Sequence, residues 1–256
     1  MKTCEGVRPL HTMTTLWRLP GAPLRSSVIR AVLAGVLVIL AYAPLVASET
    51  MSGTDYITRI LFFFAAAAVL VIGRVGDHHP FPRFGAANTV TLVRVSLVAG
   101  VAGFIGEAPS DGIAWLAAAL ITVVAVLDGV DGWLARRSAQ DSAFGARFDM
   151  ETDAALILIL SVLVWHHEKA GAWVLACGLM RYAFVVAGWI LPWMAGPLRS
   201  TLRGKSVAIG QLVGLGTALL PVVPVPFSTI VAAITLALLV WSFAVDVAWL
   251  KRQATA

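Results

Sequence analysis

Long apolar runs are the feature that most constrains the fold of this chain. Eight segments are each long enough to cross a hydrocarbon layer roughly 30 Å thick: residues 29–47, 57–73, 88–106, 112–135, 145–165, 170–193, 207–223 and 227–249. They lack the alternating pattern of a barrel strand, and a bilayer tolerates no unpaired backbone group. With 59% apolar and 13% charged residues, the sequence predicts an all-α polytopic membrane helix bundle of about eight transmembrane helices.

The basic residues indicate how these helices are oriented. If the N-terminus is cytoplasmic, 16 of the 19 Lys and Arg residues fall in cytoplasmic segments, whereas the outer segments keep only Arg59 and Lys169. The positive-inside rule therefore predicts that both chain ends face the cytoplasm. It also explains the net charge of +5, so we expect no nucleic-acid partner.

The N-terminal third has its own organisation. We expect a basic tail over residues 1–26, ahead of the first apolar run. The first apolar run also has the basic flank and apolar centre of a signal peptide, with a tolerable cleavage site at residues 46–48. We favour an uncleaved helix.

Four carboxylates interrupt the middle of the apolar pattern. Asp128 and Asp131 are three residues apart, and Asp149 and Asp153 are four apart, so each pair shares one face of a helix. A short connection near residues 137–144 lets the two helices pack antiparallel, and all four carboxylates can then converge. Acids at such a depth are costly and therefore indicate a function.

Converging carboxylates repel one another unless a cation compensates their charge. An all-oxygen ligand set suits hard ions such as Mg²⁺ or Mn²⁺ rather than Zn²⁺. Gly132 and Gly145 leave room on the same helix faces, and Arg136 can reach that room to pair with a phosphate. The competing interpretation is that Arg136, Arg137 and Arg147 form interhelical salt bridges with the acids.

Residues 128–153 resemble the signature of the CDP-alcohol phosphatidyltransferases. They read Asp128-x2-Asp131-Gly132-x2-Ala135-Arg136, eight further residues, then Gly145-x3-Asp149-x3-Asp153, without a departure from that pattern. Residues 84–250 resemble the family's six-helix core more loosely, and Asn88-x2-Thr91-x2-Arg94 looks like the start of its first helix. The resemblance thus implies two additional helices over residues 27–83 and a six-helix core over residues 84–256.

This resemblance implies an enzyme that moves a phosphatidyl group from a CDP-activated lipid, such as CDP-diacylglycerol, to a small alcohol with release of CMP. It implies that Asp128, Asp131, Asp149 and Asp153 hold two divalent ions, with Asp153 also acting as general base. The expected contacts with the CDP portion are Gly132, Arg136, Gly145, Asn88 and Thr91. The resemblance also implies a homodimer in the lipid bilayer, and we expect the active site on the cytoplasmic side of a bacterial inner membrane.

Four basic residues are candidates for binding the acceptor alcohol: Arg181, Arg199, Arg203 and Lys205. Arg181 lies about halfway along its span, and the other three lie at the cytoplasmic edge. Arg clusters favour phosphate, so the acceptor is expected to be glycerol 3-phosphate or an inositol phosphate. A structural ion pair for Arg181 and membrane anchoring for the others are the alternatives.

A divalent cation transporter or channel is the main competing function, because carboxylates inside a membrane also line ion pathways. A pathway requires polar residues through the full depth of the membrane. Here the acids collect near the cytoplasmic ends of two helices, which favours the enzyme. A lipid-binding scaffold is a third possibility, although four acids and a fitted base exceed what binding requires.

Overall fold

The computed structural model describes residues 21–138, 142–194, 196 and 201–254. Every long element in these residues is a helix: α1 (Ala22–Ala47), α2 (Gly53–His78), α3 (Ala86–Gly103), α4 (Asp111–Ser138), α5 (Ala143–His166), α6 (Leu175–Ile190), α7 (Leu202–Leu219) and α8 (Val225–Ala254). Two single 3₁₀ turns, Ala172–Val174 and Pro192–Met194, flank α6. The predicted all-α bundle is confirmed.

Six of the eight helices are long and apolar enough to cross a membrane: α1, α2, α3, α4, α8, and α6 together with its preceding 3₁₀ turn. The other two carry charges near their first turns. Arg147, Asp149, Glu151 and Asp153 lie in the first half of α5, and Arg203 and Lys205 open α7. Several helix ends differ from the predicted spans by five or more residues; α1, for example, begins at Ala22, inside the predicted tail, and α8 continues to Ala254.

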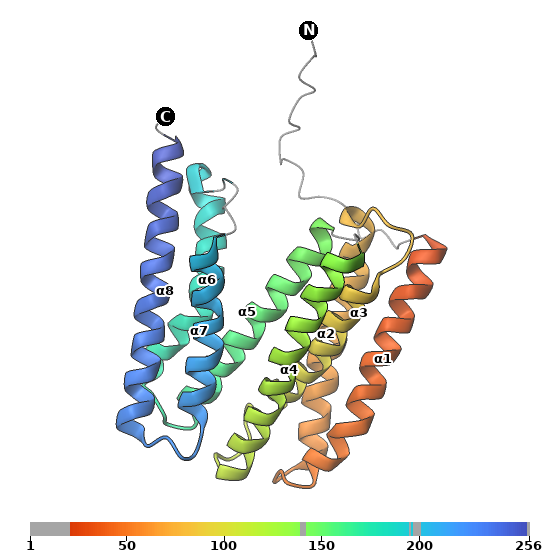
Figure 1. The fold of residues 1–256 in the computed structure, drawn as a ribbon. Helices are drawn as coiled ribbons and strands as arrows, with labels where there is room; N and C mark the ends of the chain where they lie inside the picture. Colours follow the sequence, from red (N-terminus) through yellow and green to blue (C-terminus); the bar gives the residue numbers. More distant parts are fainter. Residues whose placement is uncertain (1–20, 139–141, 195, 197–200, 255–256) are drawn as a thin grey trace.

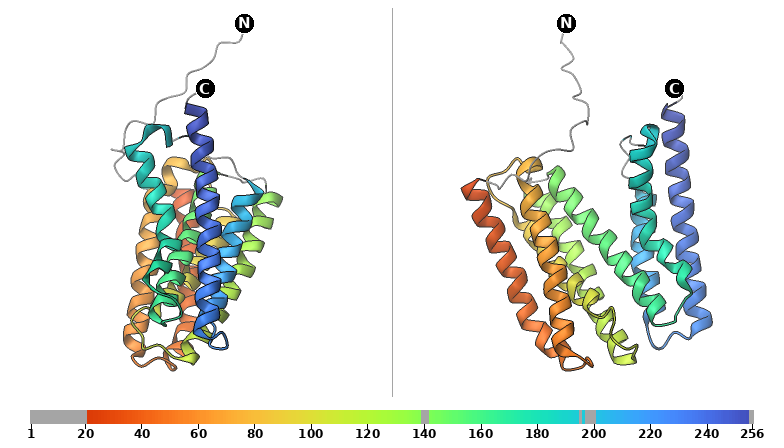
Figure 2. Two further views of the ribbon diagram at one scale, coloured as in Figure 1. Left: turned by 90° about the vertical axis from the view of Figure 1, so that its left-hand side faces the viewer. Right: turned by 180° about the vertical axis from the view of Figure 1, so that it is seen from behind.

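Helix α3 is the centre of the bundle. It packs against α1, α2, α4 and α5, whereas α6, α7 and α8 form a second group that meets the first through α5 and α7. Figures 1 and 2 show α5 running at a slant between the two groups. The start of α1 and the end of α8 lie at the same end of the bundle (Figure 1), called the terminal end below.

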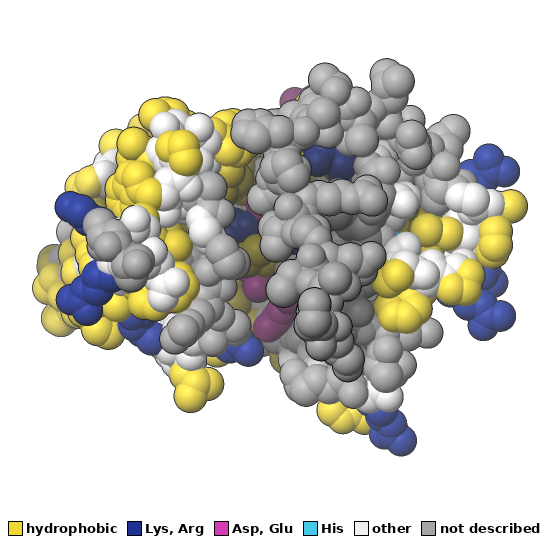
Figure 3. Space-filling model, turned by 90° about the horizontal axis from the view of Figure 1, so that it is seen from above, with side chains coloured by type: hydrophobic (Ala, Val, Ile, Leu, Met, Phe, Trp, Pro, Cys, Tyr) yellow, Lys and Arg dark blue, Asp and Glu magenta, His cyan; other side chains and the backbone are white. Residues whose placement is uncertain are grey.

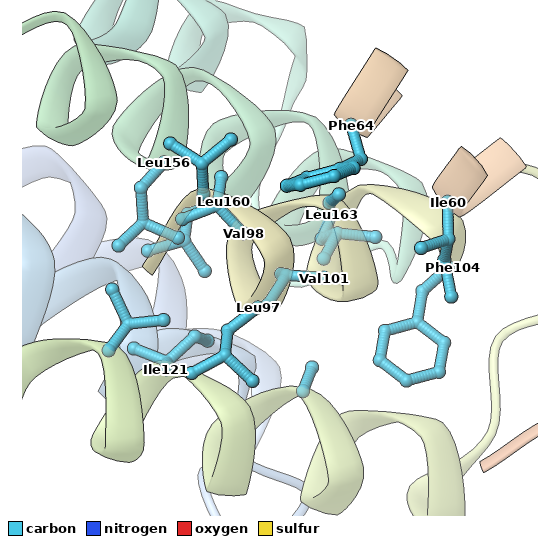
Figure 4. Close-up of a cluster of buried hydrophobic side chains, with 14 of the residues drawn as sticks. Ile60, Phe64, Leu97, Val98, Val101, Phe104, Ile121, Leu156, Leu160 and Leu163 are labelled. Atoms are coloured by element: carbon cyan, nitrogen blue, oxygen red, sulfur yellow. The ribbon is translucent and has the colours of Figure 1, made fainter. Parts of the chain in front are cut away.

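The core between α3 and α5 is apolar and tightly packed. Figure 4 shows Val98 of α3 near Leu156 and Leu160 of α5, whereas Leu97 of α3 points toward Ile121 of α4; all of them are buried. Because lipid is as apolar as leucine, such contacts stabilise a membrane bundle by close van der Waals packing rather than by removal from water. This packing fixes the distance between α3 and α5.

The two N-terminal helices are joined to α3 by hydrogen bonds as well as by packing. The Tyr42 hydroxyl of α1 donates to the Ser96 carbonyl at 2.8 Å, and the Tyr56 hydroxyl of α2 donates to the Gly100 carbonyl at 3.2 Å. Arg59 of α2 forms an ion pair with the buried Glu107, just beyond α3. The hydroxyls of Tyr42 and Tyr56 thus have hydrogen-bond acceptors inside the apolar bundle, where an unpaired hydroxyl would be destabilising. The proposed division at residue 84 stays a prediction.

The contact of α5 with α6 depends on one glycine. A Cβ atom at Gly178 of α6 would lie 2.4 Å from the Leu158 Cα of α5, so the helix backbones would have to separate. We expect Gly178→Ala to lower the free energy of unfolding by about 1 to 3 kcal/mol.

Gly210→Ala is the matched control, because a Cβ there meets nothing within 4 Å. Alanine favours the helical conformation, so this change should raise stability by up to about 1 kcal/mol. Denaturant titrations in detergent measure both variants. Equal unfolding midpoints for the two would contradict the close α5–α6 contact.

Candidate functional site

The end of α4 and the start of α5 bring the four signature carboxylates together. The chain turns back between Ser138 and Ala143, so Asp128 and Asp131 lie opposite Asp149 and Asp153. Ser142 caps α5, with its hydroxyl oxygen accepting a hydrogen bond from the Gly145 backbone N–H at 3.0 Å. The convergence expected from the spacing is therefore present.

A single guanidinium group contacts all four acids. Nη1 of Arg94 lies 2.7 Å from Asp131 and 2.5 Å from Asp149, and Nη2 lies 2.8 Å from Asp128 and 2.5 Å from Asp153. The Arg94 side chain comes from α3 and is only 1% exposed. A planar group with several N–H donors is suited to this, because it can serve carboxylates on two helices at once.

The charges in this cluster do not balance. One guanidinium offsets one of the four carboxylates, which leaves three negative charges in excess when all are ionised. Burial makes such an excess expensive unless further positive charge arrives. The Arg94 Nε atom is buried and has no hydrogen-bond partner, so this arrangement also leaves one donor unused.

Three of the acids are placed to hold a cation. One carboxylate oxygen each from Asp128, Asp131 and Asp149 lies within 4.8 Å of the other two. Two oxygens bound to one Mg²⁺ ion can be at most about 4.2 Å apart, so small side-chain rotations bring this set into range. The donor set fits a hard divalent ion. Asp153 is not one of these three acids, but it contacts the same Arg94 guanidinium that they do.

The acids differ in their access to ligands. The Asp131 side chain is 5% exposed, whereas those of Asp128, Asp149 and Asp153 are 45%, 42% and 41% exposed. Figure 3, viewed from the terminal end, shows acidic side chains in a recess near the middle and basic side chains mostly toward the edge. A ligand carrying phosphates can therefore approach three of the four carboxylates.

Two of the residues predicted to contact the CDP portion, Thr91 and Asn88, are buried on α3. The Thr91 hydroxyl lies 3.1 Å from Asp131 Oδ2, and it donates either to that oxygen or to the Ala87 carbonyl. Asn88 donates to the Phe84 carbonyl, and a Cβ at Gly145 would lie 2.7 Å from Asn88 Oδ1. Gly145 thus permits α5 to approach α3 closely.

Gly132 lies one residue after Asp131 on α4 and is half-buried. Arg136 lies one turn further along the same helix, and its side chain falls outside the described residues. Their contacts with CDP stay predictions.

The four acceptor candidates do not form one group in the structure. Arg181 forms an ion pair with Glu151 of α5, and Arg203 forms one with Asp246 of α8. Lys205 is exposed, and Arg199 lies outside the described residues. Each paired arginine therefore has an acid on a neighbouring helix that the sequence spacing did not reveal. Their binding of the acceptor stays a prediction.

Arg94 is the site residue that sequence reasoning missed. The sequence places Arg94 among the cytoplasmic basic residues, and the competing interpretation of the acids assigns their salt bridges to Arg136, Arg137 and Arg147. The available signal was the three-residue spacing of Asn88, Thr91 and Arg94, which indicates one face of α3. Which helix that face meets cannot be read from spacing.

Comparisons with known proteins agree with the location of this site. A family model described as CDP-alcohol phosphatidyltransferase matches residues 84–241. The chain is 32% identical over 113 residues to a CDP-diacylglycerol–glycerol-3-phosphate 3-phosphatidyltransferase of Escherichia coli, covering 44% of this chain and 62% of that protein. It is 32% identical over 88 residues to a protein of the same description from Cereibacter sphaeroides, covering 34% and 40%. The chain thus spans less than two thirds of either relative. No solved structure matches it.

The role of Arg94 in holding the helices together gives a stability prediction. We expect Arg94→Met to lower the free energy of unfolding by about 3 to 5 kcal/mol, because it leaves the buried Asp131 without its charged partner and removes the ion pairs of three half-exposed acids. Arg203→Met is the control, since its ion pair with Asp246 is partly exposed and should contribute about 1 kcal/mol or less. Unfolding is followed in detergent with a chelator present. Equal losses in the two variants would contradict the central role of Arg94.

Proposed function

The chain belongs to the CDP-alcohol phosphatidyltransferase family, and we propose that it moves a phosphatidyl group from a CDP-activated lipid such as CDP-diacylglycerol to an alcohol, releasing CMP. The observation that carries this proposal is the recess in which the four signature acids converge, inside the region matched by the family model. Three of these acids are open to a ligand at the terminal end of the bundle.

The same acids are our proposal for the metal site. Asp128, Asp131, Asp149 and Asp153 would hold two divalent ions, Mg²⁺ or Mn²⁺, as the excess of carboxylates and the oxygen-only ligand set support. When bound, such ions neutralise the diphosphate of the substrate and the charge that develops on the departing CMP.

Asp153 is the proposed general base. Its carboxylate is partly exposed and lies outside the triplet of oxygens closest to one another, so it is the acid freest to take up a proton. It would accept the proton of the acceptor hydroxyl while that oxygen attacks the phosphorus joined to the lipid. The bond from this phosphorus to the oxygen of CMP then breaks, and CMP leaves.

The residues around the acids divide into contact and positioning roles. Gly132, Gly145 and Arg136 are proposed to border the CDP portion. Thr91 and Asn88 stay proposed contacts of the CDP portion, and because both are buried we propose that they also position Asp131 and the α3–α5 contact. Arg94 would orient all four carboxylates before the substrate binds, which lowers the cost of arranging them during the reaction.

The acceptor is proposed to carry its own phosphate, as glycerol 3-phosphate or an inositol phosphate does. The relatives from Escherichia coli and Cereibacter sphaeroides are described as acting on glycerol 3-phosphate. Arg181, Arg199, Arg203 and Lys205 are the proposed binding residues. A phosphate would have to compete with Glu151 for Arg181 and with Asp246 for Arg203.

For the cellular setting, we propose a bacterial inner membrane with the recess and both chain ends facing the cytoplasm. The supporting observations are the charge distribution and the shared end at which α1 begins and α8 ends. A homodimer is proposed on the family resemblance alone.

Asp153→Asn tests the general base. We expect CMP release to fall by about 10² to 10⁴ fold while binding of CDP-diacylglycerol remains measurable, because the amide cannot accept the proton. Asp111→Asn is the control, since Asp111 lies in the first turn of α4, at the far end of that helix. Chelation should abolish turnover in the wild type, and added Mn²⁺ should restore it. Full activity of Asp153→Asn would rule out the assigned role.

Arg181→Ala and Arg203→Ala test the acceptor site. Loss of one charge-assisted contact with phosphate should raise the acceptor KM by about 10 to 150 fold and leave the KM for CDP-diacylglycerol unchanged. Arg83→Ala removes an exposed arginine at the same end and should change neither value. If these arginines serve only their ion pairs with Glu151 and Asp246, stability will fall while both KM values stay at wild type. A phosphate-free alcohol proving the best acceptor would also exclude the proposal.

A further inference from the structure

A second ligand-sized space lies away from the acids. It is a groove of about 540 Å³ bordered by α2, α3, α5 and one residue of α6. Asp149 and Asp153 do not line this groove, whereas Glu151 does. Glu151 lies about 200° around the α5 axis from Asp149, so the groove and the acid cluster lie on different faces of α5. Much of one wall belongs to α2, which precedes residues 84–241 and so lies outside the region matched by the family model.

The groove is apolar along its length and basic at one end. Phe63, Ala67 and Leu70 of α2 face Ile159 and other apolar residues of α5 and α3. The charged residues lining it are Arg74, Arg147 and Glu151. Arg74 lies near the end of α2 and Arg147 near the start of α5, so both belong to the terminal end of the bundle.

The two arginines are open to an anion. Both side chains are exposed, and neither has an acidic partner among the residues that the structure describes. Glu151 does not fill this role, because it forms an ion pair with Arg181. Among the side chains that the structure describes, the mouth of the groove therefore carries two arginines without a carboxylate partner.

The length of the groove matches one leaflet of a bilayer. Arg74 and Phe63 are eleven residues apart on α2, which is about 16 Å along a helix axis. Half of a hydrocarbon core is about 15 Å thick. An acyl chain beginning at the level of the two arginines would thus reach the depth of Phe63 near the bilayer centre.

We propose that this groove binds one anionic phospholipid, with its headgroup phosphate between Arg74 and Arg147 and an acyl chain along Phe63, Ala67 and Leu70. Apolar walls with charge confined to one end have the polarity of a lipid. The positive charges of Arg74 and Arg147 attract a headgroup phosphate and repel the ammonium group of a zwitterionic lipid, so they favour an anionic lipid. The bound lipid fills the space between α2 and α5. The four signature acids do not line this groove, so the proposal does not rest on the proposed reaction.

Native mass spectrometry of the purified full-length chain tests the proposal, with phosphatidylglycerol and phosphatidylcholine of identical acyl chains as probes. We expect one retained phosphatidylglycerol and at least about 5-fold weaker retention of phosphatidylcholine. Each of Arg74→Ala and Arg147→Ala should weaken phosphatidylglycerol binding by about 5 fold, and the double variant by about 30 fold. Arg25→Ala removes an exposed charge at the same membrane edge and should bind as the wild type does.

A second pair of variants keeps the charges and fills the groove. Ala67→Trp should displace the lipid, whereas Ala66→Trp, at an exposed position on the same helix, should not. This pair decides the question if the double arginine variant does not fold. Equal binding of the two lipids, or wild-type binding by the double arginine variant or by Ala67→Trp, would overturn the proposal. So would disulfide crosslinking of Leu70→Cys between two chains in the lipid-bound state, because a second copy would then cover the groove.

Discussion

The contact of Arg94 with four carboxylates is the interaction on which the rest of the site depends. Asp128 and Asp131 come from α4, Asp149 and Asp153 come from α5, and like charges would drive the ends of these helices apart. A guanidinium with several donors in one plane satisfies all four at once and thereby holds the helices in register. It does not neutralise them. The remaining negative charge is what makes the recess a place for cations and for the phosphates that cations bind.

Helix α3 makes this interaction possible because it is surrounded by other helices. A lipid-facing helix could not present a buried arginine, since the desolvation of the charge would go uncompensated. Leu97, Val98 and Val101 fix α3 against its neighbours a short distance below Arg94. The same apolar core argues against the competing cation pathway, which would require polar residues through the depth of the bundle. The tight core and the polar recess are thus two consequences of one central helix.

The sequence predicted what depends on local spacing and left open what depends on helix packing. Apolar runs predicted all eight helices, and the intervals between Asp128, Asp131, Asp149 and Asp153 predicted their convergence. The partners of Arg94, Arg181 and Arg203 could not be predicted, because each lies on a different helix, 30 or more residues away. Spacing shows which residues share a helix face, but not which helix that face meets. For the same reason Gly145 was expected to open room beside the metals, whereas it also accommodates Asn88 of α3.

The boundary of the matched family region and the boundary of the packed core are different. Residues 84–241 carry the family match, yet α3 is buried in part by α1 and α2, which precede that region. A Cβ at Gly100 would lie 2.5 Å from the Tyr42 hydroxyl oxygen of α1, and one at Gly103 would lie 2.7 Å from a ring carbon of Tyr56 of α2. The small residues of α3 thus make room for aromatic residues of the N-terminal helices. Without α1 and α2, this face of α3 would expose two glycines and the carbonyls that now accept from Tyr42 and Tyr56. The N-terminal helices are therefore part of the support that keeps α3, and with it Arg94, in place.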